Sequence, residues 1–67
     1  MPNNLKLLRL ERGLTQSELA EMLNITVPYL SKIENEKKLP NVLLAIRLAN
    51  ALDCKVEDIF FIPKRDK

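Results

Sequence analysis

The chain has 67 residues, enough for one small domain with a modest core and too few for a catalytic cleft between two domains. Hydrophobic residues make up 46% of the sequence and glycine occurs once, a balance that favours helices over strands. Eleven basic residues against nine acidic ones leave a net charge of +2, which permits nucleic-acid binding without indicating it.

The side chains that most chemistry needs are missing. There is no histidine, the commonest general base and metal ligand, and no metal-ligand cluster, phosphate-binding glycine loop or paired nucleophile and base. We therefore expect no enzyme, no metal and no cofactor. The single cysteine, Cys54, cannot form an intrachain disulfide and fits a reducing cytoplasm, where it serves as a small hydrophobic core residue. No membrane segment or lipidation motif is visible.

Capping signals predict the first two helices. Asn3 or Asn4 can cap the first helix, and Gly13 stands where its end needs a residue that tolerates positive φ. Thr15 and Glu18 form a capping box that begins the second helix. The residues predicted to face the core from these helices are Leu5, Leu7, Leu8, Leu19, Ala20, Met22 and Leu23.

Three further helices follow. The second helix ends at Asn24, and Thr26 caps a third helix only two residues later. Pro40 forbids its continuation, Asn41 caps a fourth helix, and a last short helix is predicted over 56–60. The core residues predicted from this half are Ile25, Leu30, Ile33, Val42, Leu44, Ala45, Leu48, Ala49, Leu52 and Ile59.

The connection between the second and third helices is too short for antiparallel packing, so the two should cross steeply, as in a helix-turn-helix. Ala20 is the small residue that such a crossing needs, and Asn24 tolerates the turn. The outward face of the third helix stays free for a ligand. The sequence therefore predicts a helix-turn-helix over about 16–35.

Two segments, Leu14-Thr15-Gln16-Ser17-Glu18-Leu19-Ala20 and Tyr29-Leu30-Ser31-Lys32-Ile33-Glu34-Asn35, resemble the Xre/Cro/C1 family of phage and bacterial repressors, and the similarity runs from about Leu5 to Phe60. The resemblance implies an all-α, lambda-repressor-like bundle of about five short helices in a single domain over 1–67, with room for a short C-terminal strand. It also implies that the helix near 27–35 enters the major groove of double-stranded DNA.

The resemblance assigns roles to individual residues. The predicted DNA-binding residues are Gln16, Thr26, Val27, Pro28, Tyr29, Ser31, Lys32, Asn35, Lys37 and Lys38. Gln16 would contact a phosphate and Lys32 a guanine. The alternatives are a solvated polar residue at Gln16 and a half-buried aromatic that props the helix at Tyr29. Glu36 departs from the family, which commonly has glycine there, and its carboxylate would lie near phosphate.

Arg9 and Glu34 resemble the structural ion pair of the family, which ties the first helix to the end of the third. A buried pair of this kind need not stabilise the fold, but leaving either partner alone would be costly.

A single module of this kind contacts one half-site and binds weakly, whereas a two-fold dimer reads two half-sites about 34 Å apart. We therefore expect a homodimer. The predicted interface is Phe60, Phe61 and Ile62 in a C-terminal segment 60–67, aided by the fourth helix and a short strand pairing across the axis. The alternative is that Phe60 and Ile62 close the core of the monomer.

The predicted function is a cytoplasmic transcriptional regulator, a repressor that binds an inverted-repeat operator and takes no small-molecule ligand. Two alternatives use the same fold. A protein-interaction module would bind another regulator instead of DNA. An antitoxin or restriction–modification controller would still bind DNA and would differ mainly in its genetic context.

Overall fold

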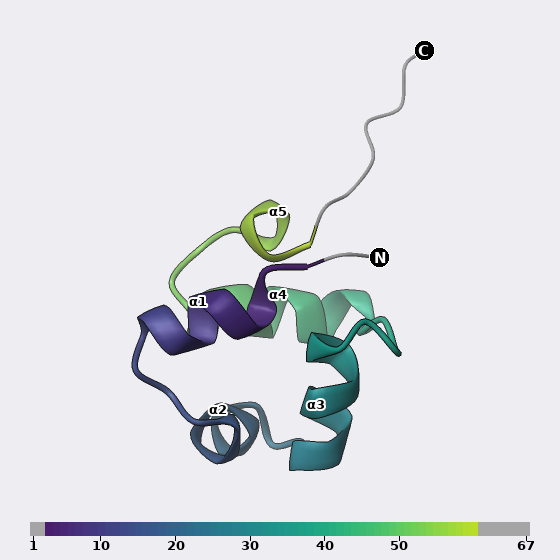
Figure 1. Ribbon diagram of the computed structural model, residues 1–67. Helices are drawn as coiled ribbons and strands as arrows, with labels where there is room; N and C mark the ends of the chain where they lie inside the picture. Colours follow the sequence, from purple (N-terminus) through teal and green to yellow (C-terminus); the bar gives the residue numbers. More distant parts are fainter. Residues whose placement is uncertain (1–2, 61–67) are drawn as a thin grey trace.

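The structure, a computed structural model, describes residues 3–60. Its five helices are α1 (Leu5–Glu11), α2 (Gln16–Leu23), α3 (Val27–Glu34), α4 (Val42–Ala51) and α5 (Val56–Ile59). In Figure 1, α1 and α4 cross the middle of the molecule, α2 and α3 lie below them, and α5 lies above. The all-α class is thus confirmed. No helix among the described residues has the length and apolar character needed to cross a bilayer.

The two ends of the described chain meet. Asn3 and Phe60 form one antiparallel bridge, and the Asn4 amide donates to the Ile59 carbonyl at 2.7 Å. The side chain of Asn3 also donates to the Ile33 carbonyl at 3.0 Å, so the segment before α1 joins α5 to the end of α3. The short C-terminal strand allowed by the sequence would continue beyond residue 60, outside the described residues.

The predicted N-caps are in place. The Thr15 Oγ1 accepts from the Glu18 amide at 3.0 Å, while the Glu18 carboxylate accepts from the Thr15 amide at 2.8 Å. The side chains of Thr26 and Asn41 accept from the backbone amides three residues ahead and begin α3 and α4. These bonds satisfy amides that have no partner within the helix. At α1 it is Asn3, not the N-cap residue Asn4, whose side chain accepts from a helical amide.

Four left-handed residues end the first four helices. They are Gly13, Asn24, Glu36 and Asp53, with φ between 55° and 70°. At each end, the amide of the next residue donates to the carbonyl five positions before it, which is the Schellman arrangement. A side chain in this conformation costs roughly 1–2 kcal/mol. Three of the four helix ends carry that cost, since only one has glycine.

The core forms where the helices converge, with α2 packed on α3 and α4, and α4 packed on α5. The largest side chains that are fully buried are Leu5, Leu19, Leu23, Leu30, Ile33, Leu48, Leu52 and Ile59. All eight were predicted as core residues. Ile25 is only partly buried, as are Leu8 and Ala45.

Three predicted core residues are wrong. Leu7, Met22 and Val42 are 56%, 52% and 77% exposed. Leu7 lies about 200° around the helix from Leu5, which points into the core. Met22 precedes the buried Leu23 and falls beside the core-facing stripe, and Val42 is the first residue of its helix, beyond the packed layer. Apolar character alone does not identify the buried face of so short a helix.

The left-handed Glu36 generates a test of stability. Glu36→Gly should raise the free energy of unfolding by about 1 kcal/mol, because glycine adopts this conformation without a steric cost. Urea denaturation followed by circular dichroism measures the change. Glu36→Gln, which removes the charge and keeps the side chain, should stay within about 0.5 kcal/mol of the parent. An equal gain in both variants would assign the effect to charge and contradict the backbone explanation.

Candidate nucleic-acid interface

The helix-turn-helix consists of α2, the connection 24–26 and α3. Ala20 is the small residue predicted for this crossing, and it is buried, with 2% of its surface exposed. Asn24 forms the turn, with a φ of 58°. The turn leads at once into Thr26, whose hydroxyl caps α3 by accepting from the Tyr29 amide at 3.2 Å. Local capping thus sets where α3 begins relative to the end of α2.

A buried ion pair fixes the other end of α3. Arg9 Nε lies 2.6 Å from Glu34 Oε2, and the two residues are 6% and 8% exposed. The same guanidinium donates through Nη1 to the Leu14 carbonyl at 2.8 Å. The pair therefore joins α1 and the loop before α2 to the last residue of α3. Among the described residues no buried side-chain nitrogen or oxygen lacks a hydrogen-bond partner, so these charges are fully compensated.

Gln16 takes part in this network. Its Nε2 donates to Glu34 Oε1 at 2.9 Å, and the side chain is half-buried. Gln16 is therefore neither a free surface amide nor a fully solvated residue. The amide keeps a second N–H and its carbonyl oxygen for another partner. Because Glu34 holds it, this polar group at the start of α2 has a defined position relative to α3.

The predicted base-reading residues differ in how freely they reach outward. Pro28 and Lys32 are exposed, whereas Val27, Tyr29 and Ser31 are partly buried. Val27 and Tyr29 pack against the core cluster, so Tyr29 is the half-buried aromatic that the alternative interpretation describes. The hydroxyl of Ser31 accepts a hydrogen bond from the side-chain amide of Asn35 at 3.2 Å.

Positive charge gathers after α3. Lys37 and Lys38 are exposed in the loop that follows the helix, and Lys38 Nζ lies 5.9 Å from the centroid of the Tyr29 ring. That distance allows a cation–π contact between the loop and the helix. The exposed Glu36 sits directly before these lysines, so one carboxylate opposes the local positive field.

The sequence did not single out Lys6. A shallow hollow lies between α1 and the starts of α2 and α3, and its lining residues include Lys6, Gln16, Ser17 and Val27. Lys6 precedes Arg9 by three residues and therefore lies on a neighbouring position of α1. The spacing of Lys6 from Arg9 was visible in the sequence. It points to a role for Lys6 only when α1 is known to lie beside the start of α2.

Among residues 3–60, no group of three His, Cys, Asp or Glu side chains could hold a metal ion. Burial, followed by the nearby Asp58 carboxylate, raises the pKa of the Cys54 thiol, although Arg12 acts in the opposite direction. A thiol with a raised pKa stays protonated and is a poor nucleophile. Cys54 packs against the core as a small hydrophobic side chain.

Comparison with known proteins agrees with this geometry. A family model described as helix-turn-helix matches residues 5–59. The HTH-type transcriptional regulator YgzD of Bacillus subtilis is 32% identical over 66 residues, which cover 98% of this chain and all of YgzD. The regulator MJ0272 of Methanocaldococcus jannaschii is 38% identical over 60 residues, covering 90% of this chain and 91% of the relative.

Two solved structures share the fold. The clp gene regulator ClgR of Corynebacterium glutamicum matches with a TM-score of 0.76 and 33% identity, over 81% of this chain and 57% of ClgR. A chain of the SinR protein/SinI protein complex matches with a TM-score of 0.74 and 33% identity, over 81% of this chain and 53% of that chain. The chain thus spans little more than half of these two longer proteins.

The Arg9–Glu34 pair generates a second test. Arg9→Ala should lower the free energy of unfolding by about 3 kcal/mol, because it leaves a buried carboxylate without its partner. Urea denaturation measures the loss. Arg12→Ala is the matched control. Arg12 lies on the surface 3.9 Å from Glu11, and a pair of this kind contributes at most about 1 kcal/mol. Equal unfolding midpoints for Arg9→Ala and the parent would show that the buried pair does not hold α1 to α3.

Proposed function

The chain belongs to the Xre/Cro/C1-type helix-turn-helix family of transcriptional regulators, which are not enzymes, and on that premise we propose that it is a repressor that binds an inverted-repeat operator as a homodimer. In the proposed complex α3 enters the major groove of double-stranded DNA. The bound dimer would act by occupancy, blocking the polymerase from the site that it covers.

The observation that carries the proposal is the double attachment of Glu34 to Arg9 and to Gln16. Phosphate contacts set the register of such a protein on DNA, and base contacts then supply specificity. Register requires that the phosphate-binding group and the reading helix hold a fixed spacing. Glu34 supports this requirement, since it belongs to α3 and accepts a hydrogen bond from Gln16 at the start of α2.

Phosphate binding is proposed for two groups of residues. Gln16 and Lys6 line the same hollow beside α1, and Asn35, Lys37 and Lys38 follow the end of α3. The cationic side chains would neutralise phosphates and release counterions, which makes affinity fall as salt rises. Glu36 would weaken the contact on its side by repelling the same phosphates.

Base reading is proposed for the outward residues of α3. Lys32 is exposed and can donate to guanine O6 or N7, while Val27 and Pro28 can contact a thymine methyl group. Thr26 and Ser31 carry hydroxyls at the same surface, although the structure already uses both within the protein. Tyr29 is held by the core and by Lys38, so its hydroxyl is the part left to meet DNA.

A protein-interaction module is the second candidate. SinR, of which the shared fold covers 53%, is described in a complex with the SinI protein, and this candidate would likewise engage another protein. This candidate predicts that Gln16 and Lys32 can be replaced without loss of function. An antitoxin or controller would behave as the first candidate does towards DNA.

The proposal is tested by selecting random duplex DNA with the purified chain at moderate salt. We expect enrichment of an inverted repeat with half-sites about one helical turn apart. Lys32→Ala should weaken binding to that site by about tenfold to a hundredfold and relax specificity at one position. Lys37→Ala should weaken all sequences alike and reduce the salt slope by about one.

Lys55→Ala is the matched control. Lys55 is exposed in the turn between α4 and α5, which Figure 1 places on the side of the molecule away from α3, so binding should not change. A folded protein that enriches no sequence would overturn the proposal and favour the protein-interaction module.

A further inference from the structure

The side chain of Asn3 joins the start of the described chain to the end of α3. Its Nδ2 donates to the Ile33 carbonyl at 3.0 Å, 30 residues away along the chain, and its Oδ1 accepts from the Leu5 amide at 3.0 Å. An asparagine amide has a donor end and an acceptor end. Both ends are used here, and only one orientation of the amide satisfies both partners.

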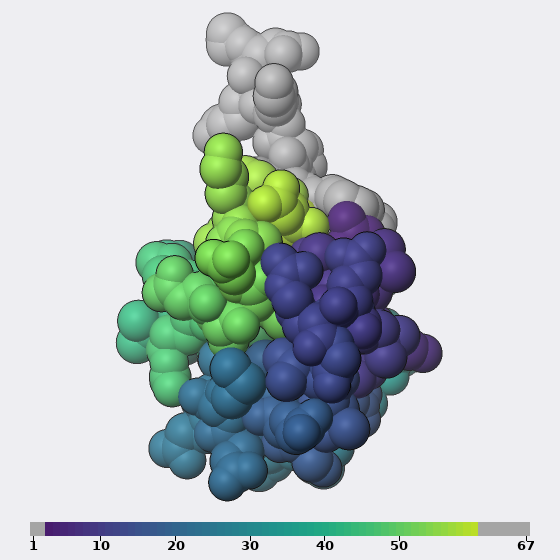
Figure 2. Space-filling view, turned by 90° about the vertical axis from the view of Figure 1, so that its left-hand side faces the viewer, coloured from purple at the N-terminus to yellow at the C-terminus, as the bar shows by residue number. Residues whose placement is uncertain are grey.

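The backbone that carries Asn3 is itself held in place. Asn3 forms an antiparallel bridge with Phe60, and the Asn4 amide donates to the Ile59 carbonyl at 2.7 Å. Figure 2 shows the purple N-terminal residues lying against the yellow-green end of α5. Because these are backbone bonds, they do not depend on the rotamer of a side chain. Asn3 therefore reaches α3 from a firm support.

The Ile33 carbonyl also belongs to the turn that ends α3. It accepts from the Glu36 amide at 3.1 Å, and the Lys37 amide donates to the Lys32 carbonyl at 2.8 Å. A carbonyl oxygen has two lone pairs, so the Ile33 oxygen can receive the Asn3 side chain and the Glu36 amide together. Asn3 is thus bonded to the same oxygen as the residue directly before Lys37.

This turn, residues 35–38, depends on support from outside. All four residues are exposed, and Glu36 holds a left-handed φ of 66°, which is unfavourable for a residue with a side chain. Lys38 Nζ lies 5.9 Å from the centroid of the Tyr29 ring, but Tyr29 belongs to α3, the helix that the turn itself ends. The bond from Asn3 differs, because it comes from another part of the fold.

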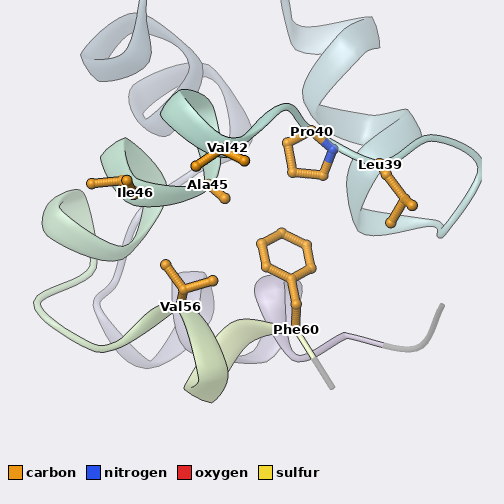
Figure 3. A pocket seen from close by; sticks show the side chains of 7 residues that line it. All are labelled: Leu39, Pro40, Val42, Ala45, Ile46, Val56 and Phe60. Carbon is orange, nitrogen blue, oxygen red and sulfur yellow. The ribbon is translucent and has the colours of Figure 1, made fainter. Parts of the chain in front are cut away.

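The chain beyond the turn is loosely packed. Leu39 is 60% exposed, and Pro40 lines a hollow of about 330 Å³ that Phe60 borders from the α5 side. Figure 3 shows the Phe60 ring pointing toward Pro40 across this space. Phe60 is 5% exposed and belongs to the core of its own chain, as the alternative considered for it required. Phe61 and Ile62, the other residues predicted for the dimer interface, lie outside the described residues.

We propose that Asn3 is a positioning residue for DNA binding. Its bond to Ile33 holds the turn 35–38 in the place from which Lys37 and Lys38 meet phosphates. The inference rests on the proposed function, which assigns these lysines to the DNA backbone. Asn3 acts through the Ile33 carbonyl and needs no contact with DNA of its own.

A turn that is already held binds phosphate more tightly than a loose one. Ordering a mobile segment on binding costs free energy, whereas a segment ordered in the free protein has no such cost. A lysine carries its charge on a flexible four-carbon stem, so the position of the backbone limits which phosphates the ammonium group can reach. Support of the turn therefore affects the salt-dependent part of the affinity.

DNA binding by Asn3→Ser tests the inference. Serine keeps a hydroxyl that can accept from the Leu5 amide, so α1 should still begin normally, but it is too short to reach the Ile33 carbonyl. The variant should bind the selected duplex about fivefold more weakly and with a shallower salt dependence. Asn4→Ser is the matched control. Asn4 donates to the Asp58 carbonyl at 3.3 Å, on the α5 side, and its replacement should leave affinity unchanged.

A second set of variants separates positioning from general stability. In a chain that carries Lys37→Ala and Lys38→Ala, Asn3→Ser should no longer weaken binding, because the side chains that Asn3 positions are gone. Equal weakening in both backgrounds would show that Asn3 only stabilises the fold, and would overturn the inference.

Nuclear magnetic resonance of the free protein gives a readout that does not need DNA. Order parameters of the backbone amides report fast motion of the turn 35–38. They should fall in Asn3→Ser and stay as in the parent in Asn4→Ser. An unchanged turn, or an unchanged affinity of Asn3→Ser for the duplex, would overturn the inference. If the parent selects no duplex while the turn loosens in Asn3→Ser, only the proposed function is overturned, and Asn3 remains the residue that holds the turn.

Discussion

The placement of α1 and α2 relative to the end of α3 depends on one constraint, the buried contact between the Arg9 guanidinium and the Glu34 carboxylate. A single helix turn separates Arg9 from the loop before α2, and Glu34 is the last residue of α3, so the pair spans the two ends of the helix-turn-helix. Arg9 also donates to the Leu14 carbonyl and Glu34 accepts from Gln16, so one network positions four segments of the chain. Apolar packing restricts the angles between these helices to a few classes, and the directional bonds to the planar guanidinium add a further geometric constraint.

The same network links stability to the proposed DNA contact. Burying two charges has a desolvation cost that their attraction need not exceed, so the pair is better understood as a source of geometry than of net stability. The network around Glu34 fixes the spacing between Gln16 and α3. Replacing both partners by apolar residues could preserve the fold and still release Gln16, because no carboxylate would then hold its amide. Stability and DNA binding are therefore separable at this site, although both pass through Glu34.

Local features such as helix caps were predictable from the residues themselves, and contacts between residues far apart in the sequence were not. The caps at Thr15, Thr26 and Asn41 involve bonds over three residues, and their side-chain chemistry alone identifies them. The pairing of Arg9 with Glu34 across 25 residues came from family resemblance rather than from any local pattern. The errors at Leu7, Met22 and Val42 share one cause. In helices of seven to ten residues the apolar stripe is too short for its period to show which leucine or valine lies outside the packed layer.

Glu36 connects the backbone to the proposed mode of action. It holds a left-handed conformation that favours glycine, and it places a negative charge beside Lys37 and Lys38. The backbone cost lowers stability, since it is the same in the free and the bound protein, whereas the repulsion of phosphate is unfavourable for binding by one protomer. With a net charge of only +2, a single copy gains little nonspecific attraction to offset this repulsion. Tight binding would then depend on two copies acting together, so operator occupancy would rise steeply with protein concentration. In the proposed mode of action, the abundance of the protein relative to its dimer equilibrium would decide when the operator is filled, and no small-molecule signal would be required.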